Sequence, residues 1–238
     1  MPMPISEKLI LRQINHWNRL RELLKAEEPA VPRRRGPVIT ISRQAGSGGR
    51  LLAGALASRL GIELQDQSLV DRIARDRNLE TEMVARLDEQ VIDQAALWVE
   101  GVMKRRIFLK DEYHVALVKA ISRLAARGGV VFLGRGAELI LKDNADLRIR
   151  LVASRHVRLA NLQDRTGLSR AEARALMEEN DRRRSEFIRS IFKVEPGRPE
   201  DFDLVLNADR MSIEQMTELS LLAMIKPQDP GIAAAAGG

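Results

Sequence analysis

Residues 38–51 read Val-Ile-Thr-Ile-Ser-Arg-Gln-Ala-Gly-Ser-Gly-Gly-Arg-Leu. The β-branched run at the start predicts a strand, the glycines predict a loop, and a helical pattern begins near Arg50. Strand, glycine loop and helix in this order form the arrangement that holds a nucleotide phosphate. Glycines let the backbone approach the anion, and the N-terminus of the helix presents free N–H groups to it.

The loop departs from the standard phosphate loop, which reads G-x-x-x-x-G-K-[ST]. Gly49 stands at the lysine position, and Leu51 is near the position of the magnesium-binding hydroxyl. Arg50, one position beyond the lysine, is the candidate replacement cation because its longer fork could still reach a phosphate. Arg43 stands where an ordinary loop has glycine, and either points into the site or caps the sheet edge. A tight turn that binds no ligand is the alternative for the whole segment.

The composition excludes several classes of function. The 238 residues contain no cysteine, which excludes disulfides, thiol catalysis and cysteine-bound zinc, and the three histidines lack ligand spacing. No secretory signal and no apolar stretch of about 18 residues is present, so we expect a cytoplasmic protein. The net charge of +6 favours an anionic partner, although a solvated arginine-rich surface would give the same number.

The chain is predicted to have three parts. Residues 1–36 form an N-terminal helix, over 6–28, and a proline-rich linker; the helix packs back in cis or mediates dimerisation or partner binding. Residues 37–226 form the main domain, and residues 227–238 form a disordered tail. Arg33 to Arg35 are interpreted as linker, with an RNA-binding arm as the lesser alternative.

Within the main domain, strands alternate with helices. Strands are predicted at 38–42, 62–65, 130–133, 147–152 and 203–206, and helices at about 50–60, 68–77, 80–106, 112–127, 154–165, 169–192 and 212–225. This alternation predicts a parallel sheet with right-handed crossovers. Capping boxes at Ser169 and Ser212 and a stop at Gly167 support the helix boundaries. The long helical gap between the second and third strands, about 66–127, predicts an insertion.

Charged residues at the carboxyl ends of the strands are candidate ligand-binding groups, because ligands of open α/β sheets bind there. Arg135 follows the third strand and suits bidentate phosphate binding, or is a surface arginine in a glycine turn. Asp66 ends the second strand and could organise Mg²⁺ through water, or is an ordinary acid at a helix start; Arg72 follows in the next helix.

An arginine-rich helix segment is the candidate lid, at about 180–198. Arg182 and Arg189 share one face with Glu186 between them, and Arg183 shares a neighbouring face with Phe187. Clustered arginines suit a lid that closes on a triphosphate and neutralises transition-state charge. A solvated basic face is the alternative.

These residues resemble the cytidylate kinase-like family, in the branch whose loop reads Ser-Arg-Gln-x-Gly-Ser-Gly-Gly-Arg. The resemblance covers about residues 37–225 and is carried by 42–50, 131–137, 147–158 and 201–212. It implies an α/β, three-layer P-loop nucleoside monophosphate kinase fold. The five-stranded parallel sheet would have the order 2-3-1-4-5, with a helical monophosphate-binding insertion and an arginine lid before the fifth strand.

The resemblance implies ATP-dependent phosphoryl transfer to a nucleoside monophosphate, CMP or dCMP, with Mg²⁺. It implies that the donor's phosphates are held by the loop, and the acceptor by residues of the insertion and of the third strand. By resemblance, Gly46, Ser47, Gly48, Gly49 and Arg50 would hold the donor's phosphates, Arg72 and Arg135 the acceptor's phosphate, and Arg183 with its neighbours would form the lid. Their positions in the sequence add Arg43 to the donor-binding candidates and Asp66 to the acceptor-binding candidates. The candidate catalytic arginines are Arg50, Arg182, Arg183 and Arg189. Cytidylate kinases carry Gly-Arg-Asp where this chain has Gly136, and their aspartate meets the acceptor's sugar.

Two other functions remain open. The chain could be a nucleotide-binding sensor or scaffold with little or no kinase activity, which Gly49 and Leu51 motivate. Nucleic-acid binding is less favoured because single-strand readers usually add stacking aromatics to a basic groove, and this chain has one tyrosine and two tryptophans.

Overall fold

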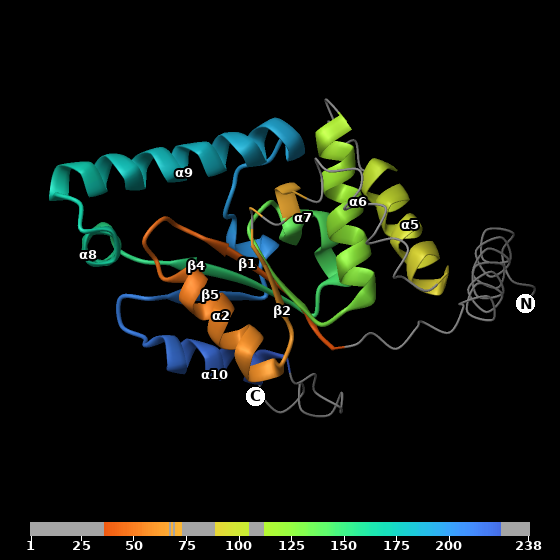
Figure 1. The fold of residues 1–238 in the computed structure, drawn as a ribbon, viewed down its shortest axis with the longest axis horizontal. Coiled ribbons are helices and arrows are strands. Elements are labelled where there is room, and N and C mark those ends of the chain that lie inside the picture. Colours follow the sequence, from red (N-terminus) through yellow and green to blue (C-terminus); the bar gives the residue numbers. More distant parts are fainter. Residues whose placement is uncertain (1–35, 67, 69, 73–88, 105–111, 225–238) are drawn as a thin grey trace, which may run out of the picture. The chain divides into compact units, whose positions relative to one another are not determined.

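The computed structural model describes residues 36–66, 68, 70–72, 89–104 and 112–224 (Figure 1). The predicted N-terminal helix, its linker and the tail lie outside the described residues, as do parts of the predicted helices 68–77 and 80–106. The described residues belong to one compact unit, Arg34–Gly238. In this part of the chain no helix combines the length and the apolar character needed to cross a membrane.

Five parallel strands form one sheet in the order β2-β3-β1-β4-β5, which confirms the predicted topology. The strands are β1 (Val38–Arg43), β2 (Glu63–Asp66), β3 (Val130–Leu133), β4 (Leu147–Val152) and β5 (Leu204–Asn207). The first four residues of the central strand β1 are buried on both faces because helices cover both sides of the sheet. Its carboxyl end therefore lies between those of β3 and β4.

Helices cover the two faces and make three layers (Figure 1). On one face α2 (Gly49–Leu60) and α10 (Ile213–Ala223) pack on a core that includes Ile39, Ile41 and Leu52. On the other face α5 (Glu89–Lys104), α6 (Glu112–Arg127) and the short α7 (Ala137–Leu141) surround Val38 and Phe132. Val38 and Ile39 belong to different cores because successive side chains of a strand point to opposite faces of the sheet.

The helices α5 and α6 occupy the long gap between β2 and β3 and pack against each other, as expected for an insertion. The short α7 after β3 and the 3₁₀ turns Lys142–Asn144 and Pro199–Asp201 were not predicted. They are one or two turns long, which is too short for a periodic apolar pattern to show.

The helix α8 (Arg155–Thr166) ends, and α9 (Arg170–Phe192) begins, where the capping residues predict. Gly167 ends α8 in the left-handed conformation at φ 69°, and Ser169 forms a complete capping box with Glu172. Ser212 forms the second predicted capping box, at the start of α10.

Candidate functional site

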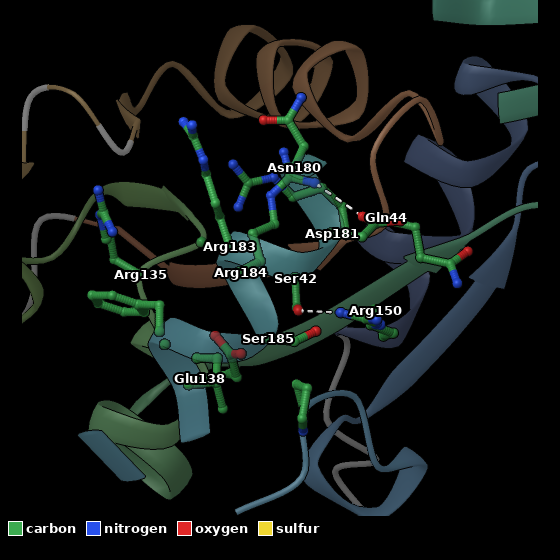
Figure 2. A pocket seen from close by; sticks show the side chains of 16 residues that line it. Ser42, Gln44, Arg135, Glu138, Arg150, Asn180, Asp181, Arg183, Arg184 and Ser185 are labelled. Carbon is green, nitrogen blue, oxygen red and sulfur yellow. Dashed lines mark hydrogen bonds and ion pairs between the residues drawn. The ribbon is translucent and has the colours of Figure 1, made fainter. Parts of the chain in front are cut away.

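A cavity of about 300 Å³ lies at the carboxyl ends of β1, β3 and β4, beneath the middle of α9 (Figure 2). Its size is at the small end of the range for small-molecule sites. Most of its lining is polar, and five of the lining residues are arginines. The lining residues are Ser42, Arg43, Gln44, Gly134, Arg135, Gly136, Glu138, Arg150, Asn180, Asp181, Arg183, Arg184, Ser185, Phe187, Ile188 and Pro196.

The helix α9 spans the cavity because it is anchored near both ends. Toward its N-terminus Ala173 and Met177 pack with Leu159 and Leu162 of α8. Toward its C-terminus Ile188 and Ile191 are buried, Ile191 within the core over β3. The arginine-rich turns lie between these anchors, so the helix holds Arg183 and Arg184 over the strand ends (Figure 2).

Three of the cavity arginines have a lowered pKa, chiefly because burial disfavours their charged form. Burial, with Arg184 as the next cause, lowers the pKa of Arg43 to about 9. Burial also lowers the pKa of Arg150 and of Arg184. Arg150 donates to Ser42 Oγ at 2.6 Å, and Arg184 lies 3.5 Å from Asp181. An anion in the cavity would offset this positive charge and favour the charged form of these arginines.

Arg135 projects from the turn after β3 in the left-handed conformation, at φ 60°. Its guanidinium pairs with Asp71 and lies 4.7 Å from the centroid of the Phe187 ring, with its Nε buried and unpartnered. A non-glycine residue in this conformation is uncommon, and such strain concentrates at functional sites. The contacts orient a planar donor at the cavity wall, where a phosphate could accept two hydrogen bonds.

Glu138 is the buried carboxyl of the cavity, and its side chain is 6% exposed. Its Oε2 atom has no hydrogen-bond partner. Burial raises the pKa of Glu138, while Arg150 and Arg43 oppose that shift and Asp201 adds to it. A protonated Glu138 could donate to a ligand oxygen, and an ionised one could accept from a ligand hydroxyl or amine.

This raised pKa predicts a pH-dependent stability. Glu138 holds its proton more tightly in the folded than in the unfolded protein, so the protonated group stabilises the fold. This contribution to the free energy of unfolding is fully present below about pH 4.5 and is lost as pH rises through the folded pKa. We expect Glu138→Gln to abolish this loss, so that the wild type loses stability relative to the variant as pH rises above about 4.5. Urea unfolding at a series of pH values measures the difference. The exposed Glu214→Gln is the control, and parallel curves for wild type and Glu138→Gln would contradict the prediction.

The glycine loop between β1 and α2 is held from behind by α8. Arg158 donates through Nε to the Ala45 carbonyl at 2.8 Å, and Asn161 donates to the Gly46 carbonyl at 2.9 Å. Gly46 has φ +80°, and a Cβ there would overlap the Arg158 carbonyl oxygen, so this position requires glycine. The first N–H groups of α2 have no hydrogen-bond acceptor within the described residues. These N–H groups belong to Gly48, Gly49 and Arg50, and the start of a helix with free N–H groups is a position where an anion could accept hydrogen bonds.

Two of the predicted loop side chains point elsewhere. The Arg50 side chain is 67% exposed and pairs with Asp66 at 2.7 Å, away from the cavity lining. Asp66 also accepts hydrogen bonds from the N–H and the hydroxyl of Ser68. The candidate cation Arg50 and the candidate acid Asp66 therefore bind each other in this structure. The Ser47 hydroxyl is buried and donates to the Gln44 carbonyl at 2.9 Å, which orders the loop.

The predicted lid arginines divide into two groups. Arg183 lines the cavity and also pairs with Glu179. Arg182 is exposed between Glu179 and Glu186, and Arg189 is exposed beside Glu195; neither lines the cavity. Arg72 of the insertion is exposed and lies outside the lining as well. Of the predicted arginines, the cavity therefore brings together Arg43, Arg135 and Arg183.

Sequence reasoning missed Glu138, Arg150, Arg158 and Arg184. A signal for Arg150 exists, because arginines alternate with apolar residues in Leu-Arg-Ile-Arg-Leu-Val of β4. Arg158 carries no local signal, since its partner Ala45 is 113 residues away in the chain.

In the described segments, no group of three or more histidine, cysteine, aspartate or glutamate residues could hold a metal ion.

Comparison with known proteins places the chain in a family. The sequence pattern of the cytidylate kinase-like family matches residues 38–210. A cytidylate kinase from Vibrio vulnificus is 28% identical over 218 residues, covering 78% of this chain and 94% of that protein. A uronate isomerase from Corynebacterium glutamicum is 35% identical over 96 residues, 40% of this chain, but the chain spans only 18% of that protein. An uncharacterized protein from Eubacterium ventriosum has a similar structure, with a TM-score of 0.62, 22% identity, and coverage of 80% of this chain and 98% of that one.

Proposed function

Because the chain belongs to the cytidylate kinase-like family, we propose that it transfers the γ-phosphoryl group of ATP to a nucleoside monophosphate, with CMP and dCMP as acceptors. The observation that carries this proposal is the arginine-lined cavity directly beside a glycine loop with free N–H groups. Two adjacent anion sites are what transfer between two phosphorylated molecules requires.

The donor fits the loop. The N–H groups at the start of α2 would bind the phosphates of ATP, and the positive end of the helix dipole would favour their charge. Leu51, near the position of the usual hydroxyl ligand, is 65% exposed and offers no oxygen. Mg²⁺ would be held by the phosphate oxygens of the nucleotide and by water, and when bound it would neutralise phosphate charge.

The acceptor fits the cavity. Arg135 lies in the turn after β3 and Arg150 lies on β4, the two strands that flank β1, and their guanidinium groups would bind the phosphate of the monophosphate. Arg183 and Arg184 would approach the transferred group from α9. An oxygen of the acceptor phosphate would then attack the γ-phosphorus, the bond to the bridging oxygen would break, and ADP would leave. The protein supplies positioning and charge, and arginines in such sites contribute about 10³–10⁵ in rate.

A coupled assay of ADP formation, with each nucleoside monophosphate in turn, tests this proposal. We expect turnover that depends on CMP or dCMP, and a fall in kcat/KM of at least about 10²-fold in Arg135→Ala. The matched control is Arg174→Ala on α9, an exposed arginine paired with Glu178 outside the cavity. We expect this variant to retain wild-type activity.

The alternative is a nucleotide-binding sensor or scaffold without turnover, which the absence of a lysine at Gly49 favours. Stabilisation of the fold by MgATP separates the two functions. A ligand at 100 times its dissociation constant adds about 2.7 kcal/mol of stability. Stabilisation by MgATP with no turnover for any monophosphate would contradict the kinase and support the sensor.

A further inference from the structure

Arg43 and Gly49 share one volume in the loop, and only one of them can carry a side chain. A Cβ added to Gly49 would lie 2.8 Å from both Cβ and Cγ of Arg43, and 3.6 Å from its Cδ. The Cβ of Arg43 is fixed by the backbone of β1, so a change of rotamer alone cannot relieve this overlap. The arginine stem therefore runs past the first residue of α2, where the lysine of a standard loop begins.

The guanidinium of Arg43 ends at the carboxyl end of β3. Its Nη1 would overlap a Cβ added to Gly134, and its Cζ would lie 3.0 Å from it. Gly134 has φ +87°, and its N–H donates to the Ile41 carbonyl, so the turn is fixed around the arginine. The side chain thus extends from the end of β1, past the head of α2, to the cavity that the strand ends form.

Arg43 lacks a partner in the described part of the chain, where it makes neither a hydrogen bond nor an ion pair. Its positive neighbours are Arg184, Arg135 and Arg50, and Glu138 is the acidic neighbour. A partly buried arginine among other arginines is unfavourable unless an anion joins it. Arg50, by contrast, already has Asp66 as its partner.

We propose that Arg43 takes the place of the missing loop lysine and binds the phosphate that the donor transfers, and that Gly49 is glycine to leave room for it. The inference rests on the proposed function for the identity of the anion. It also replaces Arg50 as the candidate cation: Arg43 starts from the opposite end of the loop and reaches the same region between the loop and the strand ends. A lysine there binds the β- and γ-phosphates in standard loops.

The steric half of the proposal is tested without ligand. We expect Gly49→Ala to lower Tm by about 5 °C in the wild type, because the added methyl group overlaps the arginine stem. In the Arg43→Gly background the same change should leave Tm unchanged or raise it, since alanine favours the helix. Gly54→Ala on α2 is the matched control, because nothing lies within 4 Å of its added Cβ, and it should raise Tm by about 2 °C in both backgrounds.

The phosphate half is tested by titrating MgATP into wild type, Arg43→Gly, Gly49→Lys and the double variant. We expect at least tenfold weaker binding in each single variant, and recovery to within about threefold in the double variant, where the lysine replaces the arginine. Circular dichroism confirms that each variant is folded.

Equal changes in Tm for Gly49→Ala in both backgrounds would overturn the claim that Arg43 occupies the space of a side chain at position 49. Wild-type affinity in Arg43→Gly, or a double variant no better than the singles, would overturn the phosphate role while leaving the proposed function intact. A wild type that binds no MgATP would overturn the proposed function and the phosphate role together. The Tm values of Gly49→Ala with and without Arg43→Gly would still test the steric claim.

Discussion

Asp181→Ala is expected to lower the free energy of unfolding by about 3 kcal/mol, the low end of the cost of removing one partner from a buried ion pair, because the arginine of this pair is buried while Asp181 itself is 32% exposed. Asp181 pairs with Arg158, whose side chain is 11% exposed, and accepts from the Ala45 N–H at 2.8 Å. It also faces Arg184. Its loss leaves a buried guanidinium uncompensated and releases the contact between α9 and the loop.

Thermal unfolding measures this effect as a fall in Tm of about 6–12 °C for a domain of this size. Asp181→Asn should be intermediate, because its amide oxygen can still accept from Ala45 while the charge opposite Arg158 is gone. The control is Glu178→Ala, because Glu178 is on the same helix as Asp181 but is exposed. This change removes ion pairs with Arg155 and Arg174 and should leave Tm close to that of the wild type. A small effect of Asp181→Ala would show that α9 and the loop are independent.

Gly136→Asp is expected to destabilise the fold by about 3 kcal/mol and to create no cytidylate kinase activity beyond that of the wild type. This substitution would restore the Gly-Arg-Asp sequence of cytidylate kinases. Here, however, a Cβ at position 136 would lie 2.5 Å from Cε2 and 2.8 Å from Cζ of the Phe192 ring. The residue also has φ +66°, which an L side chain adopts at a cost.

The end of α9 therefore occupies the place of that aspartate. We expect Gly136→Asp to be tolerated better in a Phe192→Ala background, because the ring that it overlaps is removed. A double-mutant cycle of Tm values measures this coupling. Additive effects of the two changes would contradict the steric explanation, and a gain of CMP turnover in Gly136→Asp would show that the acceptor's sugar can still bind there.

Cytidine recognition in this chain would then need another group. Glu138 is two residues further along and is the buried carboxyl of the cavity, with an unpartnered oxygen. Its position fits a hydrogen bond to a hydroxyl or an amine of the acceptor.

The sheet could be predicted from the sequence because its signals are local. The β-branched run before the glycine loop, the short apolar strands and the capping boxes at Ser169 and Ser212 are all patterns of a few residues. The strand order came from the family resemblance, and the structure confirms it. The bounds of the strands differ from the predicted ones by one residue at most.

The site could be predicted only in part. The sequence indicates Arg135 because the carboxyl end of a strand is a ligand-binding position, and Arg183 because clustered arginines on a helix suit a lid; both line the cavity. Arg50 was favoured over Arg43 because it is next to the missing lysine in the sequence. Proximity in the chain is a poor guide here, since a side chain at the start of a helix can point away from the loop, as Arg50 does toward Asp66.

The sequence by itself determined the parallel α/β fold, the glycine loop after the first strand, and an arginine-rich segment ahead of the last strand. Only the tertiary structure decided which arginines meet: Arg43 beside Gly49 and Gly134, Arg150 beside Ser42, and Arg158 beneath the loop. The physical reason is that burial and partners set the chemistry of a guanidinium. Both are properties of the packed volume, in which Arg150 meets Ser42 and Arg158 meets Ala45 from more than a hundred positions away in the chain.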